Sequence, residues 1–155
     1  MTDGLHFKDR LHHRLPSSVP EGAAFHIRIR CQPSQLTREP LIAPSLGRAL
    51  LGSARHYHLQ HRRCCFIFLL MPDHLHMLAM FPREEGMSRV VHDWKRWQTR
   101  QHAVNWQDGY FDHRIRGDRE FGLKVHYVRQ NPVVKELCAR AEDWPWFCEP
   151  AHENA

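Results

Sequence analysis

The sequence CCFIFLLMPDHLHMLAMF, residues 64–81, predicts the centre of the fold. Its first seven residues are a continuous apolar run, which is typical of a strand buried on both faces. The next three residues, Met71-Pro72-Asp73, interrupt this run, because proline cannot donate a ladder hydrogen bond and Pro-Asp favours a turn. We therefore expect residues 74–81 to return antiparallel as the second strand of a hairpin.

The elements on either side of this hairpin follow from hydrophobic periodicity. Before it, residues 25–31 alternate between an apolar and a basic face, which predicts a strand, and residues 46–60 have helical spacing. After it come an apolar helical stripe (87–97), a short strand (110–116) and a third helix (118–131) that ends before a proline. The order β-α-β-β-α-β with an added C-terminal helix predicts an α+β fold with a ferredoxin-like antiparallel sheet.

Length and composition favour one compact domain. The chain has 155 residues, of which 42% are hydrophobic and 25% charged, and this excludes a wholly disordered or fibrous protein. No apolar run approaches the roughly 18 residues of a membrane span, and the first 20 residues lack the apolar segment of a signal peptide. We expect a basic N-terminal arm (1–20), a core domain (21–148) and a tail (149–155).

Cysteine usage favours a reducing compartment. The five cysteines are an odd number, Cys64 and Cys65 are adjacent, and no C-x-x-C pair occurs. Neither a disulfide framework nor a zinc ribbon is therefore indicated. We expect the thiols to fill the core of a cytoplasmic protein.

The charge balance favours a polyanionic partner. The formal net charge is +5, and 18 of the 22 cationic side chains are arginine. Because the guanidinium group binds phosphate through two hydrogen bonds, this bias fits nucleic acid, although a solvated arginine-rich surface has the same composition. The cations that we expect to contact nucleic acid are Arg10, Arg14, Arg28, Arg30, Lys95, Arg114 and Arg116.

His74-Leu75-His76 is a candidate metal-binding pair. Residues i and i+2 of a strand project from the same face, so both imidazoles can reach one ion. The other H-x-H pair, His56 and His58, falls on a predicted helix, where the two rings diverge. With 14 histidines in the chain such a pair also arises by chance, and two polar strand histidines are the alternative.

Tyr127 and Asn131 are a second candidate pair, one helical turn apart and hence on one face of the third helix. Packing would explain a tyrosine there, but the neighbouring Lys124 and Arg129 make a phenol that reaches solvent equally reasonable. A nucleophilic role would require a nearby cation or base, because a phenol is largely protonated at neutral pH. Asn131 could bring its amide oxygen to the same metal ion.

Five ordered blocks of sequence resemble the HUH single-strand DNA endonucleases, and specifically the REP-associated tyrosine transposases. The blocks are LMPDHLH (70–76), SRVVHDWK (88–95), FDHRIR (111–116), YVRQNPV (127–133) and WPW (144–146). The order of strands and helices extends the likeness back to residue 24. The resemblance implies that residues 21–148 are an HUH transposase domain. The chain departs from the family in carrying Asp73 where asparagine is common.

The resemblance also implies an activity and a site. A tyrosine on the added helix, here Tyr127, would cleave and rejoin DNA at repetitive palindromic (hairpin) sequences through a covalent 5′-phosphotyrosine intermediate. His74, His76 and Asn131 would bind a divalent metal ion, Mg²⁺ or Mn²⁺. The partner would be single-stranded or hairpin DNA, bound by a monomer or homodimer in the bacterial cytoplasm and associated with the nucleoid.

Two alternative functions can be compared with this one. A catalytically silent ferredoxin-like nucleic-acid-binding module would keep the basic faces but form no covalent adduct with DNA. A two-histidine cyclic phosphodiesterase also places histidines on strands, but it needs two H-x-[S/T] motifs. Neither His56 nor His74 has Ser or Thr two positions later, which argues against the phosphodiesterase.

Overall fold

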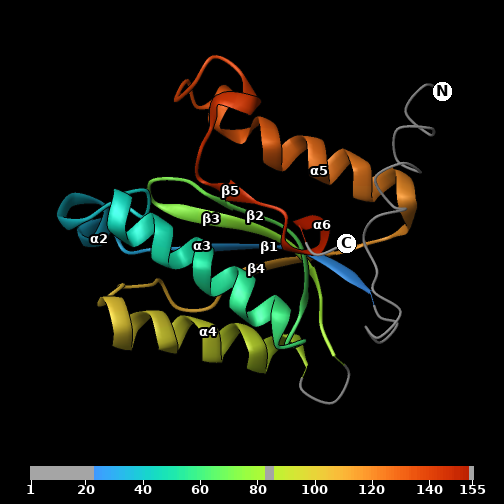
Figure 1. The fold of residues 1–155 in the computed structure, drawn as a ribbon, viewed down its shortest axis with the longest axis horizontal. Helices are drawn as coiled ribbons and strands as arrows, with labels where there is room; N and C mark the ends of the chain where they lie inside the picture. Colours follow the sequence, from blue (N-terminus) through green and yellow to red (C-terminus); the bar gives the residue numbers. More distant parts are fainter. Residues whose placement is uncertain (1–22, 83–85, 154–155) are drawn as a thin grey trace.

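A computed structural model describes residues 23–82 and 86–153 and has a five-stranded sheet with helices on both faces (Figure 1). In chain order the elements are β1 (Ala24–Arg30), α2 (Pro33–Arg38), α3 (Pro44–Leu59), β2 (Cys64–Leu70), β3 (His74–Met80), α4 (Met87–His102), β4 (Phe111–Ile115), α5 (Gly117–Val134), the 3-10 helix η1 (Ala141–Asp143), β5 (Phe147–Cys148) and α6 (Pro150–Glu153). The strand order is β4-β1-β3-β2-β5, and every pair is antiparallel. The first four strands have the order of a ferredoxin-like sheet, so the predicted fold class is confirmed.

The predicted hairpin forms the middle of this sheet. Residues 71–73 turn the chain between β2 and β3, and the Met71 N–H donates to the His74 carbonyl at 2.8 Å. All residues of both strands are buried, because α3 and α4 lie on one side of the sheet and α5 on the other (Figure 1). Residues 64–70 are therefore apolar at every position rather than at alternate ones.

Side-chain alternation gives β1 and β3 one apolar face and one partly polar face. The odd-numbered side chains pack in the core cluster with residues of α3 and α4; they are Ile27, Ile29, Cys31, Leu75, Met77 and Ala79. The even-numbered side chains point to α5, because successive strand residues alternate between faces. His26, Arg28 and Arg30 therefore share a face with His74 and His76, and the register pairs Arg28 with His76 and Arg30 with His74.

Helix α5 continues beyond its predicted end. The sequence predicts a stop before Pro132, but the helix runs to Val134 with a buried Pro132 inside it. The prediction was wrong because a proline near the end of a helix removes one hydrogen bond, and burial of the ring can offset that loss. Asn131 consequently keeps helical geometry one turn after Tyr127.

Three further differences concern short elements and the surface. Residues 33–38 form the short helix α2, although their hydrophobic pattern is too brief to predict one. Trp97, the last residue of the predicted apolar stripe, is 51% exposed, because the buried face of α4 continues through Gln98 instead. The predicted tail, 149–155, includes α6, whose Ala151 is buried in a cluster with residues of β2.

Other expectations concern the cysteines, the arm and the membrane. All five cysteines are free, and four of them are buried, as expected of core residues. The predicted arm, with Arg10 and Arg14, lies outside the described residues. Within the residues that the structure describes, no helix has both the length and the apolar character needed to span a bilayer.

Gly47 of α3 lies against the indole ring of Trp146. A Cβ added to Gly47 would lie 2.5 Å from Cζ3 and 2.7 Å from Cε3 of that ring. We expect Gly47→Ala to lower the free energy of unfolding by about 1–3 kcal/mol, because the helix and the ring must move apart. Urea unfolding followed by circular dichroism measures the change.

Gly52→Ala is the matched control in the same helix, since no described atom outside the neighbouring helix backbone lies within 4 Å of its added Cβ. This variant should gain up to about 1 kcal/mol, because alanine favours the helical conformation. Equal effects of the two substitutions would show that the Trp146 contact does not restrict residue 47.

Candidate active site

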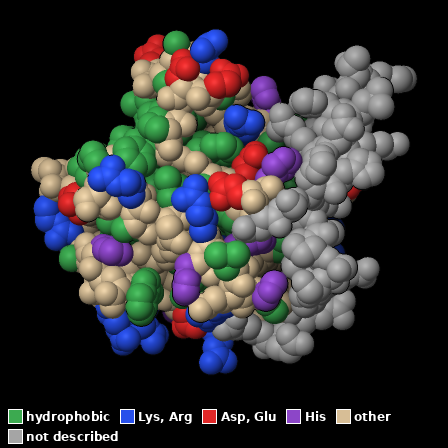
Figure 2. All heavy atoms as spheres, in the orientation of Figure 1, with side chains coloured by type: hydrophobic (Ala, Val, Ile, Leu, Met, Phe, Trp, Pro, Cys, Tyr) green, Lys and Arg blue, Asp and Glu red, His purple; other side chains and the backbone are tan. Residues whose placement is uncertain are grey.

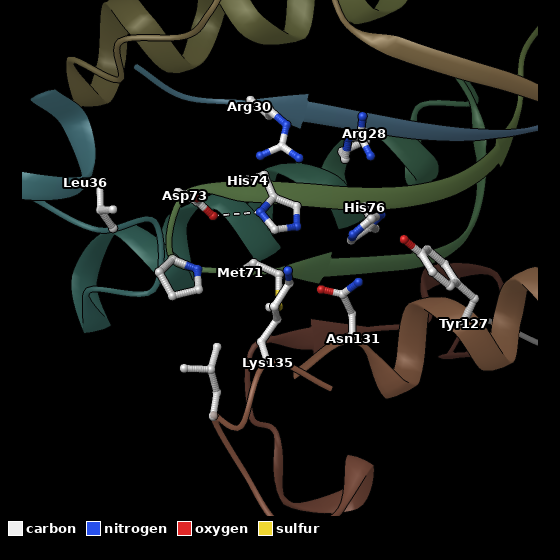
Figure 3. A pocket seen from close by; sticks show the side chains of 12 residues that line it. Arg28, Arg30, Leu36, Met71, Asp73, His74, His76, Tyr127, Asn131 and Lys135 are labelled. Atoms are coloured by element: carbon white, nitrogen blue, oxygen red, sulfur yellow. Dashed lines mark hydrogen bonds and ion pairs between the residues drawn. The ribbon is translucent and has the colours of Figure 1, made fainter. Parts of the chain in front are cut away.

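One pocket brings the two predicted residue pairs together. It lies between the α5 side of the sheet and the C-terminal half of α5, and its volume is about 480 Å³ (Figure 3). The lining residues are Arg28, Arg30, Leu36, Met71, Pro72, Asp73, His74, His76, Tyr127, Asn131, Lys135 and Leu137. Four elements distant in sequence therefore contribute to one cavity: β1, α2, β3 with the turn before it, and α5 with the residues that follow it.

His74 and His76 enter this pocket from β3, and each has its Nδ1 atom engaged by a neighbour. Nδ1 of His74 lies 2.7 Å from Oδ1 of Asp73, and Nδ1 of His76 lies 2.9 Å from Nε2 of His26. The two ring centroids are 5.0 Å apart with an interplanar angle of 80°. Nε2 of each ring is therefore the atom available to a ligand, and Nε2 of His76 has no hydrogen-bond partner within residues 23–82 and 86–153.

The electrostatic environment keeps these imidazoles neutral. Burial, together with neighbouring positive side chains, lowers the pKa of His76 to about 2 and the pKa of His26 to about 4. Burial also lowers the pKa of His74, while the hydrogen bond and the charge of Asp73 raise it. A neutral imidazole carries the lone pair that a metal ion requires.

Tyr127 and Asn131 reach the same pocket from α5. Tyr127 is 48% exposed, and its ring meets the rings of His26 and His76 edge-on, each at a centroid distance of 5.9 Å. Its hydroxyl points toward His76 (Figure 3). The ammonium of Lys124 lies 5.7 Å from the centre of the Tyr127 ring. Tyr127 is therefore accessible from solvent and has both a cation and two imidazoles beside it.

The donor atoms of the pocket fit a divalent metal ion. Nε2 of His76 and Oδ1 of Asn131 are buried acceptors without partners in the described part of the chain, and a bound cation would satisfy both. That part of the chain has no three His, Cys, Asp or Glu side chains placed to hold a metal, so the amide would be the third protein ligand. Two imidazoles and one amide leave coordination positions open for phosphate oxygens.

Arg28 and Arg30 are the predicted DNA-contacting cations that line this pocket. Both also line a smaller adjoining pocket of about 230 Å³, together with residues 107–111. The guanidinium of Arg28 lies 4.8 Å from the centre of the Phe111 ring, and Phe111 is 42% exposed. A cation and an aromatic surface therefore lie next to the candidate site.

The other predicted cations within the described residues, Lys95, Arg114 and Arg116, do not line this pocket. The Lys95 ammonium donates to the carbonyls of Gln107 at 3.0 Å and Gly109 at 2.7 Å, so it holds the loop before β4. Arg114 is exposed on β4, and Arg116 is exposed at the residue before α5. In Figure 2 the Lys and Arg side chains of the visible face are spread over several places, with Asp and Glu among them.

Sequence reasoning gave no role to two residues that contact the candidate metal ligands, His26 and Asp73. The face on which His26 lies follows from the same alternation that placed Arg28 and Arg30 on one face of the first strand. The contact of His26 with His76 depends on the pairing of β1 with β3, and the sequence does not give that register. The position of Asp73 in the turn was predicted, but its contact with His74 was not.

Comparison with known proteins gives two curated relatives, although no family model matches the chain. A protein of Haemophilus influenzae named as a REP-associated tyrosine transposase is 23% identical over 111 residues, which cover 61% of each chain. The REP-associated tyrosine transposase of Escherichia coli is 26% identical over 84 residues, which cover 51% of this chain and 50% of the relative. The chain thus matches between half and three fifths of the length of these relatives.

A solved structure extends the comparison to the fold. The structure of a REP-associated tyrosine transposase bound to a REP hairpin matches with a TM-score of 0.68 at 17% identity. The match covers 86% of this chain and 80% of the other. In sequence and in fold, this chain is similar to the REP-associated tyrosine transposases.

Proposed function

We propose that this protein is a metal-dependent tyrosine transposase that cleaves and rejoins single-stranded DNA at repetitive palindromic (hairpin) sequences. The observation that carries the proposal is a single pocket shared by Tyr127, His74, His76 and Asn131. The names of the two relatives and the hairpin-bound protein of the same fold support it. The whole site comes from one chain, so a monomer can complete it, and a homodimer is the alternative.

Tyr127 is the nucleophile in this proposal. Its phenolic oxygen attacks the scissile phosphorus in line, the phenolic proton leaves, and the bond from phosphorus to the 3′ oxygen breaks as that oxygen gains a proton. The products are a 5′-phosphotyrosine and a free 3′-hydroxyl. Because the phosphodiester energy is kept in the phosphotyrosine, the 3′-hydroxyl of another strand can displace Tyr127 and rejoin the DNA without ATP.

His74, His76 and Asn131 would hold a divalent ion through the two Nε2 atoms and the amide oxygen. When bound, the ion draws negative charge from the scissile phosphate. Imidazole ligands suit Mn²⁺, whereas Mg²⁺ prefers oxygen ligands but is abundant in cells, so both ions are candidates. Asp73 orients the ring of His74 through Nδ1 and makes that ligand more basic.

Single-stranded DNA is the substrate that the surroundings favour. Arg28 and Arg30, which both lie on β1 and line the pocket, can bind backbone phosphates, and Phe111 offers an exposed ring on which a base can stack. In a paired duplex the bases stay inside the stack, so none of them could stack on Phe111. DNA contacts by Arg10, Arg14, Lys95, Arg114 and Arg116 stay predictions, as does the location at the nucleoid.

Tyr127→Phe should abolish the covalent protein–DNA adduct, because the nucleophilic oxygen is missing. Hairpin affinity should stay almost unchanged, because the ring itself is retained. Denaturing electrophoresis with a labelled hairpin-flanked oligonucleotide in Mn²⁺ or Mg²⁺ measures the adduct. Tyr57→Phe, in α3 on the opposite side of the sheet, is the matched control and should keep the adduct. A wild-type protein that binds the hairpin but forms no adduct in either metal would favour the silent binding module.

Arg28→Ala and Arg30→Ala should each weaken binding of single-stranded DNA. Each lost phosphate contact should also reduce the slope of log K against log salt by about 0.7. Fluorescence anisotropy over a salt series measures both quantities. Arg48→Ala is the control, because Arg48 is exposed on α3 across the sheet from the pocket. If Arg48→Ala reduced the slope of log K against log salt as much as the other two variants, the DNA strand would not bind at the pocket.

Asp73→Ala should lower the pKa of His74 further, because the carboxylate opposes the lowering caused by burial. Asp73→Asn keeps an acceptor without the charge and should give an intermediate pKa. An NMR titration of the His74 ring in the metal-free protein measures the change, with Glu142→Gln in η1 as a distant control. If the pKa of His74 is the same in Asp73→Ala and in the wild type, the contact between Asp73 and His74 has no influence on it.

A further inference from the structure

We propose that His26 is a positioning residue that fixes the tautomer of His76. In this arrangement Nδ1–H of His76 donates to Nε2 of His26, and Nε2 of His76 faces the pocket as an acceptor. The inference rests on the metal-dependent function proposed above, and it assigns a role to a histidine outside the H-x-H pair.

The contact between the two histidines is close and well buried. Nε2 of His26 lies 2.9 Å from Nδ1 of His76, and the rings stack at a centroid distance of 5.2 Å with an interplanar angle of 20°. His26 is 2% exposed and His76 is 1% exposed. The strand register pairs His26 with Leu78, not with His76, so the hydrogen bond runs diagonally from β1 to β3 on the α5 face.

A neutral imidazole has one N–H and one acceptor nitrogen, so the shared hydrogen bond links the tautomers of the two rings. If His26 were the donor, Nε2 of His76 would carry a hydrogen and could not bind a metal ion. If His26 is the acceptor, that nitrogen presents a lone pair. The cations Arg28 and Arg30 line the same pocket and favour a lone pair there over an N–H group.

His26 acts on His76 as Asp73 acts on His74. Each partner contacts Nδ1 of a proposed ligand histidine, so Nε2 of that histidine stays available to the ion. Residues that contact metal-bound histidines usually orient them in this way. The two partners differ in charge because their surroundings differ. Asp73 lies in a partly exposed turn, whereas a carboxylate at the buried position 26 would carry a large desolvation cost.

His26 is not placed to be a third ligand. Its Nε2 is already occupied by His76, and within residues 23–82 and 86–153 no three His, Cys, Asp or Glu side chains are arranged to hold a metal. The ring of His26 also meets Tyr127 edge-on at a centroid distance of 5.9 Å. Its position therefore sets both the orientation of a ligand and the packing beside the nucleophile.

Two amide variants separate hydrogen bonding from packing. In His26→Gln the side-chain oxygen can occupy the position of Nε2 and accept from His76. In His26→Asn the amide ends at the position of Nδ1 and falls short. Calorimetry should show that His26→Asn binds Mn²⁺ with an affinity about 10- to 100-fold lower than that of the wild type. His26→Gln should regain most of the lost affinity. Equal affinities for the wild type and His26→Asn, or equal losses in both variants, would overturn the proposal.

The tautomer can be read without metal and without a variant. Nitrogen-15 NMR of the imidazole rings in the metal-free wild type should show His76 protonated at Nδ1. An Nε2–H tautomer of His76 would refute the role of His26. This measurement needs no variant, so it holds even if the variants fail to fold. If the wild type bound no Mn²⁺ but had the expected tautomer, the proposed metal function would fail while the His26–His76 arrangement stood. The covalent-adduct assay then reports separately on Tyr127.

Discussion

The strict alternation of side chains along β1 and β3 is the constraint on which the site depends. Every residue of β3 is buried, and its odd-numbered apolar side chains fix the register by packing in the core cluster shared with α3 and α4. A slip of one residue would exchange the faces, placing His74 and His76 in that apolar cluster and Leu75 in the pocket. The same core packing that stabilises the fold therefore presents the two histidines to α5.

Burial of polar groups on the α5 face gives the pocket its chemistry. A buried nitrogen or oxygen without a partner costs free energy, and here Asp73 and His26 satisfy Nδ1 of the two histidines. Among the described residues, Nε2 of His76 and Oδ1 of Asn131 stay unpartnered and are acceptors in the proposed tautomer, whereas Nδ1 of His26, also unpartnered, then carries the hydrogen. Burial and nearby positive side chains disfavour a proton on His76, and a bound metal ion would accept a lone pair from each of the two acceptors.

The sequence predicts those features that depend on local periodicity. The hairpin, the two faces of β1 and the shared face of Tyr127 and Asn131 each follow from a spacing of two or of about four residues. Features set by contacts between elements that are distant in the sequence cannot be predicted from this spacing. Pro132 stays helical because its ring is buried, and His26 meets His76 because β1 pairs with β3 in one particular register. The roles of Tyr127, His74, His76 and Asn131 come from the family resemblance together with this spacing, and they stay proposals.

The basic composition points to nucleic acid, but many of the cations have structural partners. Arg63 is 2% exposed and lies 5.2 Å from the centre of the Tyr57 ring, and Lys95 holds a loop through two carbonyls. Charge that is committed to the protein contributes little to phosphate binding, so net charge overstates the binding surface. Arg28 and Arg30 differ because the strand alternation directs them to the face of the sheet that carries the candidate site. The placement of Arg28 and Arg30 in the pocket that Tyr127 also lines, rather than the total number of arginines, is therefore what supports the proposed binding of a DNA strand.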